Sequence, residues 1–287
     1  MRAMKLFALA CVTLLAACPP PGNTTGTGGG GGRGGAGGGI SPDSCGKIDG
    51  TDTGRKLYSF LLASAELDRA SLELETSIAG ACRRMARALG VDETGDTKTV
   101  CTRAATELDA NLKVSVKTES RLVTKHTPPV CETKVDLEAG FIAECEGRAV
   151  ANNSGGSASA ECRASAGIRA TTRTECSEPK VEVVRENVTI VDDSKFQKAM
   201  AAIDAGMPAI LRATKKLELA GKAVATWVET GANLVASSGK LVADLGEHGV
   251  CVAGQLIAVA AASTNIQARI SVSIEVSASV SASAGAQ

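Results

Sequence analysis

Cysteines are the residues of this chain whose type and spacing most clearly indicate a chemistry. The sequence has ten of them and only two histidines, His126 and His248. Thiols form disulfides in an oxidising compartment, or bind metals when closely spaced Cys and His ligands accompany them. No Cys-x-x-Cys pair occurs, and the two histidines lie far apart in the sequence. The sequence therefore predicts disulfide bonds, and it predicts neither a metal site nor a cofactor.

Four of the cysteines are placed symmetrically about one turn. Cys131 and Cys176, like Cys145 and Cys162, are centred on Asn153-Ser154 within a turn-forming run. Residues equally distant from the turn of an antiparallel hairpin face each other. Small or apolar residues also alternate with charged ones along both arms of this segment, which favours strands. We therefore expect the disulfides Cys131–Cys176 and Cys145–Cys162 within one β-hairpin.

The remaining cysteines of the body are paired by less direct arguments. Cys82 and Cys101 flank a turn near residues 90–96, between two helical patterns, and a disulfide there would join the two helices. Cys45 and Cys251 are then paired by elimination. An even number of body cysteines agrees with an exported protein.

The first residues have the order of charge, apolar run and cysteine found in an export signal. Arg2 and Lys5 precede the apolar run Leu6–Ala17, which ends in Leu-Ala-Ala before Cys18. About 12 apolar residues are too few for a transmembrane helix, which needs about 20. The segment is therefore a targeting signal rather than a membrane span.

This segment resembles the signal peptides of bacterial lipoprotein precursors. The resemblance implies a signal peptide at residues 1–17, removed before Cys18, and acylation of Cys18 with diacylglyceryl and palmitate groups. Pro19 follows the cysteine, and in Gram-negative lipoproteins a residue other than aspartate there implies the outer membrane of the cell envelope. The alternative is an ordinary cleaved secretory signal, with Cys18 unmodified.

A glycine-dominated segment at residues 18–44 follows the signal. Such a composition buries little apolar surface and predicts a disordered tether with an end-to-end distance of about 30 Å. The lipid bilayer is then the first expected partner, bound through acylated Cys18. Nucleic acid is not expected, because the chain has 31 basic and 31 acidic residues and lacks a basic footprint.

Residues 45–287 are expected to form a single α+β domain. Apolar residues recur at helical spacing over long segments, while alternating patterns predict an antiparallel sheet of about five strands that packs on the helices. The third helix should kink or break at Gly206-Met207-Pro208 and again at Leu245–Gly249. The expected helices are 54–89, 97–112 and 194–268, and the expected strands are 114–125, 130–150, 158–177, 180–191 and 269–284.

No catalytic motif accompanies these elements, so an enzyme is not expected. The sequence favours a non-enzymatic structural or interaction module of the envelope, with an envelope protein as a second partner. Its heptad-like stripes suit an internal bundle or an intermolecular coiled coil, so they leave the oligomeric state open. The alternative is a membrane-active protein, because long helices with a β-hairpin extension are similar to α-helical pore-forming toxins. Val250–Ala262 is then the candidate for insertion, whereas the charged face of the cysteine hairpin departs from that pattern.

Overall fold

The computed structural model describes residues 40–116, 121–133, 135–147, 159–186, 189–236 and 245–284. These residues belong to one compact unit, Gly38–Gln287, and Met1–Gly37 is a separate unit. The predicted signal peptide, Cys18 and nearly all of the predicted tether lie outside the described residues. The described part contains six α-helices and two small two-stranded sheets. The expected sheet of about five strands is therefore wrong.

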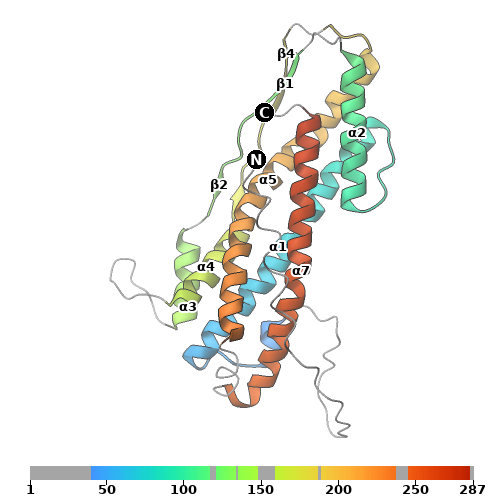
Figure 1. Ribbon diagram of the computed structural model, residues 1–287. Coiled ribbons are helices and arrows are strands. Elements are labelled where there is room, and N and C mark those ends of the chain that lie inside the picture. Colours follow the sequence, from blue (N-terminus) through green and yellow to red (C-terminus); the bar gives the residue numbers. More distant parts are fainter. Residues whose placement is uncertain are drawn as a thin grey trace, which may run out of the picture. The chain divides into compact units, whose positions relative to one another are not determined.

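Helix α1 (Asp52–Leu89) packs on α5 (Asp193–Ala236), and together they form the centre of the core (Figure 1). The predicted helical stripe of α1 is confirmed, with Leu57, Phe60 and Ile78 fully buried. The helix begins at Thr51, whose hydroxyl accepts a hydrogen bond from the Gly54 amide. It ends at a left-handed glycine, Gly90. These two caps explain why the helix has these ends.

Helix α2 (Thr97–Ser115) lies on α1 and α7, and it begins where the Asp96 carboxylate accepts a hydrogen bond from the Thr99 amide. The expected helix at 97–112 is confirmed, with one further turn at its end. Residues 113–115 were expected to be the start of a strand. They are helical instead, and Val116 then forms an isolated bridge with Ile190.

In the described residues, the expected helix at 194–268 corresponds to α5 and the first part of α7, and residues 237–244 lie outside the described residues. Of the kink or break expected at Gly206-Met207-Pro208, the break does not occur, because α5 continues through Pro208. The proline ring removes one backbone donor, and the chain is helical on both sides of it. The break near Gly246 is confirmed: a 3-10 turn, η3 (Gly246–His248), precedes α7 (Gly249–Ser283), and Gly246 has a positive φ of 55°.

Residues 269–284, expected to be a strand, are the second half of α7. Their alternating apolar residues also recur at every fourth position, as Val272, Val276 and Val280 do. The intervening serines Ser273 and Ser277 are fully buried, because small side chains allow neighbouring helices to approach closely. The alternating sequence is therefore compatible with a strand and with a helix, and packing against the neighbouring helices favours the helix.

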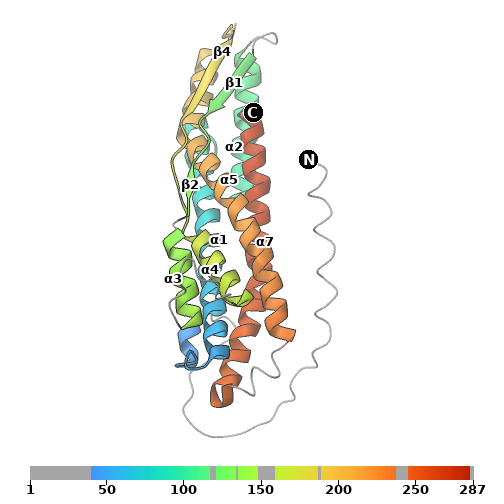
Figure 2. The ribbon, with the colours of Figure 1, turned by 90° about the vertical axis from the view of Figure 1, so that its left-hand side faces the viewer.

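The expected β-hairpin of residues 130–150 and 158–177 is mostly a pair of helices, α3 (Val135–Glu146) and α4 (Ala160–Thr172) (Figure 2). Only β2 (Cys131–Glu132) and β3 (Glu175–Cys176) pair as strands, in the expected register. Two antiparallel helices also face each other symmetrically about a turn, so the cysteine symmetry did not distinguish helices from strands. Ser159 is the N-cap of α4, because its hydroxyl accepts a hydrogen bond from the Cys162 amide. A serine at this position favours the start of a helix, but the alternating pattern that follows it also fits a strand.

A second antiparallel pair joins β1 (Arg121–His126) to β4 (Val181–Glu186). Strand β4 falls within the expected strand 180–191, whereas β1 overlaps the expected strand 114–125 and ends one residue beyond it. Among the described residues, these strands pair only with each other. Thr124 of β1 donates a hydrogen bond to the carbonyl of Ala284, at the end of α7. The ribbon thus lies where α7 ends, and it does not extend the core as a sheet.

Candidate functional site

Disulfide bonds join four pairs of elements, and the disulfide prediction is confirmed. The paired cysteines are those given by the sequence: Cys82–Cys101 links α1 to α2, Cys145–Cys162 links α3 to α4, and Cys131–Cys176 links β2 to β3. Cys45–Cys251 links the short 3-10 helix η2 (Pro42–Cys45) to the first turn of α7. Every cysteine in the described residues is bonded, so none of them is a nucleophile.

Helix η2 also connects α1 and α7 through side chains. The Tyr58 hydroxyl of α1 donates a 2.7 Å hydrogen bond to the Asp43 carboxylate of η2, and this bond, with burial, raises the pKa of Tyr58 to about 12. On the other side, the Gln255 side chain of α7 accepts from the Ser41 amide and donates to the Ser44 hydroxyl. The segment that leads to the N-terminal region is therefore fastened to the start of α7.

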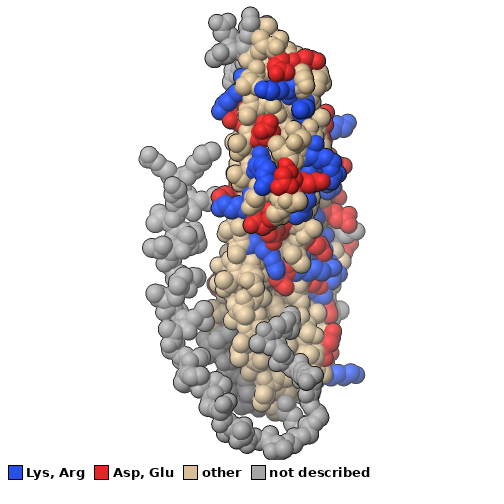
Figure 3. All heavy atoms as spheres, turned by 90° about the vertical axis from the view of Figure 1, so that its right-hand side faces the viewer, with Lys and Arg blue, Asp and Glu red and all other residues tan. Residues whose placement is uncertain are grey.

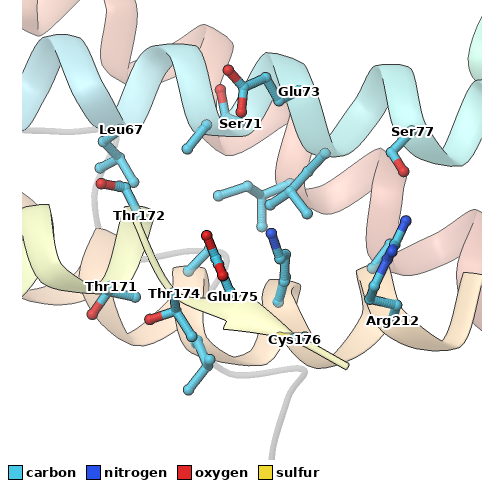
Figure 4. Close-up of a pocket in the computed structure, with 17 residues that line it drawn as sticks. Leu67, Ser71, Glu73, Ser77, Thr171, Thr172, Thr174, Glu175, Cys176 and Arg212 are labelled. Carbon is cyan, nitrogen blue, oxygen red and sulfur yellow. The ribbon is translucent and has the colours of Figure 1, made fainter. Parts of the chain in front are cut away.

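A cavity of about 350 Å³ lies between α1, the segment from α4 to β3, and α5 (Figure 4). Buried Leu67, Leu74 and Ile270 form its apolar wall. Two of the hydroxyls along it have partners: Ser71 donates to the Asp68 carbonyl, and Thr174 donates to the Ala170 carbonyl. These two hydroxyls therefore form hydrogen bonds within the fold.

Four charged side chains line the same cavity: Glu73, Glu175, Arg212 and Lys216. Figure 4 places Arg212 and Ser77 at one end and Leu67 with Thr172 at the other. Two acids and two bases balance in charge. The lining has no histidine, and its one cysteine, Cys176, is in a disulfide. The cavity can admit a small molecule, and its lining offers neither a histidine base nor a free thiol nucleophile.

A network of charged groups joins α4 to α1 and α3. The Arg169 side chain is only 7% exposed, and its guanidinium contacts the carboxylates of Glu66 at 3.4 Å and Glu144 at 2.8 Å. The same guanidinium lies 3.9 Å from the centre of the Phe141 ring. Arg173 adds a second contact to Glu66, at 2.6 Å. Arg169 and Glu66 are largely buried and Glu144 and Arg173 are exposed, and each charge has a partner, which is typical of a structural network.

Metal and histidine chemistry find no support in the part of the chain that the structure describes. No group of three or more His, Cys, Asp or Glu side chains is arranged there to hold a metal ion. His126 ends strand β1, and His248 is an exposed residue of η3. The structure therefore does not bring the two histidines into one site.

The first half of α7 has a surface unlike the rest of the bundle. From Gly249 to Ala268 it contains no Asp, Glu, Lys or Arg. Val252, Leu256 and Val259 face the core, whereas Val250 and Ile257 are 81% and 70% exposed. By length and composition α7 is the one helix among the described residues that could cross a membrane, and 28% of its most apolar window is buried.

We call the exposed side of this segment the neutral face of α7. It consists of Val250, Gly254, Ile257, Ala260 and Ala261, which are all exposed. The side of the molecule on which α7 and α2 lie has charged side chains gathered over its upper part and an uncharged area below them (Figure 3). The sequence prediction named Val250–Ala262 as an apolar segment, but only the structure shows which of its residues remain uncovered.

Comparison with known proteins gives no relative: no family model, no curated protein and no solved structure matches this chain.

Proposed function

We propose that this protein is a lipid-anchored module of the bacterial envelope that binds or supports other envelope components and has no enzymatic activity. The observation that carries the proposal is the set of four disulfides, which join every major helix except α5 to a neighbour. Bonds of this number persist in an oxidising compartment outside the cytoplasm. The signal-like residues 1–17 and Cys18 supply the corresponding route and anchor.

The arrangement of the cavity and of the charged network supports a binding or structural role. The charged groups of the network are paired with one another, and the cavity lining has neither a histidine nor a free thiol. The proposed partners are the lipid bilayer, through acylated Cys18, and an envelope protein. In a Gram-negative cell the proposed location is the outer membrane.

Labelling in the native host with a palmitate analogue tests the anchor. The full-length precursor should incorporate the label and fractionate with the outer membrane. The Cys18→Ser precursor should incorporate none, whereas Cys11→Ser, which changes a cysteine within the proposed signal, should still be labelled. Absence of label from the unsubstituted protein would refute the lipoprotein assignment.

A second candidate function is membrane activity, and the apolar character of α7 favours it. In this hypothesis α7 leaves the bundle and crosses a bilayer. Dye-loaded vesicles test it: leakage caused by the unlipidated mature chain would support insertion, and intact vesicles at high protein concentration would exclude it.

A further inference from the structure

We propose that the neutral face of α7 docks on the surface of the same bilayer that holds the acyl chains, without leaving the bundle. This inference rests on the proposed function, because it uses the lipid anchor at Cys18. It adds a second, non-covalent membrane contact, formed by Val250, Gly254, Ile257, Ala260 and Ala261. The occupant of this face is therefore a lipid bilayer rather than a protein.

The first argument is the polarity of the helix. A helix at the surface of a bundle normally has an apolar stripe toward the core and charged residues outside. The first half of α7 buries Val252, Leu256 and Val259, yet its opposite side is also apolar, with Val250 and Ile257 largely exposed. About 20 residues without charge extend for about 30 Å along the helix. Beyond Ala261 the exposed side carries the polar residues Thr264, Asn265 and Gln267, so both sides are largely apolar only from Val250 to Ala261, and the bundle covers one of them.

The second argument is the place at which the anchored segment enters the bundle. Cys45 is joined to Cys251, with 5.5 Å between their Cα atoms, and Cys251 is adjacent to Val250. Ser41 and Ser44 are hydrogen-bonded to Gln255, one helical turn further along. The chain that leads to Cys18 therefore starts beside the neutral face. With a tether of about 30 Å end to end, membrane attachment at Cys18 brings this face near the lipid at a high effective concentration.

The third argument is the contrast with the second half of α7. Arg269 contacts Asp68 of α1 at 2.7 Å, and Glu275 contacts Lys98 of α2 at 2.9 Å. Those ion pairs hold the second half of the helix to the bundle. The first half has no such contact, since it has no charged residue, and its N-terminus is held by the disulfide. The helix is thus fixed at both ends, and its outer side is free to meet lipid without unfolding.

The chemistry of the face also specifies how it should bind. Interfacial helices with Lys and Arg bind anionic lipids and weaken in salt. The neutral face has no cation, so apolar burial alone would drive its binding. Binding should therefore be similar on zwitterionic and on anionic vesicles, and it should be insensitive to ionic strength.

Vesicle co-sedimentation of the mature chain carrying Cys18→Ser, exported with an ordinary secretory signal, tests the inference. The chain should sediment with phosphatidylcholine vesicles, and equally with vesicles that also contain phosphatidylglycerol. Val250→Glu and Ile257→Glu should each weaken binding by about tenfold, equivalent to about 1.4 kcal/mol. Non-reducing peptide maps of each variant should show the same four disulfides as the unsubstituted chain.

The chain offers matched controls for both substitutions. Val135, in the first turn of α3, is 78% exposed and matches Val250, and Leu72 of α1 is 50% exposed and serves for Ile257. Val135→Glu and Leu72→Glu should leave vesicle binding within about twofold of the unsubstituted chain, because neither lies on α7.

Several results would overturn the inference. The inference is wrong if the unsubstituted chain remains in the supernatant, or if the control variants lose as much binding as the α7 variants. It is also wrong if binding requires anionic lipid. Leakage of dye at the concentrations that give binding would show insertion of α7 instead. Dissociation of a dimer by Ile257→Glu in light scattering would show that a second copy covers the face. Failure to label Cys18 with palmitate refutes the anchor and is observed separately from any vesicle result.

Discussion

Helices α1 and α7 have similar lengths, 38 and 35 residues, but very different surfaces. Helix α1 buries one stripe and carries charged residues on its other sides, among them Glu66, Asp68 and Glu73, which form ion pairs. Helix α7 contains only two charged residues, Arg269 and Glu275, both in its second half. The outer side of α1 therefore carries charged groups that water solvates, whereas the first half of α7 exposes apolar side chains to water.

The difference shows how each helix is held in place. Helix α1 is central and contacts α2, α3, α4, α5 and α7, so its position depends on packing from several sides. The first half of α7 packs through Val252, Leu256 and Val259, has no charged residue that could form an ion pair, and is linked to η2 by the disulfide Cys45–Cys251. We infer that the chain uses packing to fix α1, and a covalent bond to keep an apolar helix attached to the bundle.

The largest expected effect is on this covalent bond. Replacing Cys45 and Cys251 by Ser removes a link between residues 206 apart, whereas replacing Cys82 and Cys101 removes one between residues 19 apart. Loop-closure entropy predicts losses of about 5 and about 3 kcal/mol in the free energy of unfolding. Guanidinium unfolding, followed by the fluorescence of the single tryptophan, Trp227, measures both. A greater loss for the Cys82–Cys101 pair would contradict the distinction between α1 and α7.

The next effect concerns the charged side of α1. Glu66→Ala removes a carboxylate that is 12% exposed and leaves the buried Arg169 with Glu144 alone. Removing one carboxylate partner of a buried guanidinium should lower the free energy of unfolding by about 3 kcal/mol. Glu73→Ala is the control on the same helix, because that side chain is 67% exposed, and its effect should be within about 0.5 kcal/mol. Equal effects from the two variants would show that the Arg169 network contributes little.

How far the sequence predicts the structure also differs between these helices. The spacing of Leu57, Phe60, Leu67 and Ile78 fits a helix and no strand, so α1 was predicted almost to its ends. In α7 the alternation of Val or Ile with Ser fits either a helix or a strand, and the expected strand at 269–284 was wrong. The ambiguity arises because positions four apart share a face in both structures, and serine is small enough for either kind of contact.

The candidate sites were predicted unevenly for a related reason. The symmetric positions of the cysteines give the pairs that the structure joins, although α3 and α4 are helices, because symmetry about a turn does not depend on the type of element. The cavity was not predicted, since Leu67, Thr172 and Arg212 come from three helices and meet only through packing. The neutral face was predicted as an apolar segment, but its exposure depends on which helices cover α7.

Close packing along α1 leads to a third prediction, smaller than the first two. A Cβ atom added at Gly206 of α5 would lie 2.2 Å from Cγ of Met85 in α1, whereas one at Gly221 meets nothing within 4 Å. Gly206→Ala should therefore lower the free energy of unfolding by about 1–3 kcal/mol through overpacking. Gly221→Ala should raise it by about 1 kcal/mol, because alanine favours the helix. Thermal unfolding of both variants checks the signs, and stabilisation by both would refute close α1–α5 contact at Gly206.

The smallest effect tests the link between α1 and the start of α7 through η2. Tyr58 is the only tyrosine, so the ultraviolet absorbance of its phenolate reports this residue alone. Its titration in the native protein should have a midpoint near pH 12, against about 10 for an unperturbed tyrosine. Since folding raises this pKa, the stability gained from the bond to Asp43 is fully present below pH of about 10 and is lost as the pH rises toward 12. Asp43→Asn should return the midpoint toward 10, because it removes the acceptor carboxylate, and a rapid pH jump limits alkaline disulfide exchange. A native midpoint near 10 would mean that the Tyr58 hydroxyl is not bonded to η2, and that η2 is held by its contacts with α7, which are the disulfide and the hydrogen bonds of Gln255.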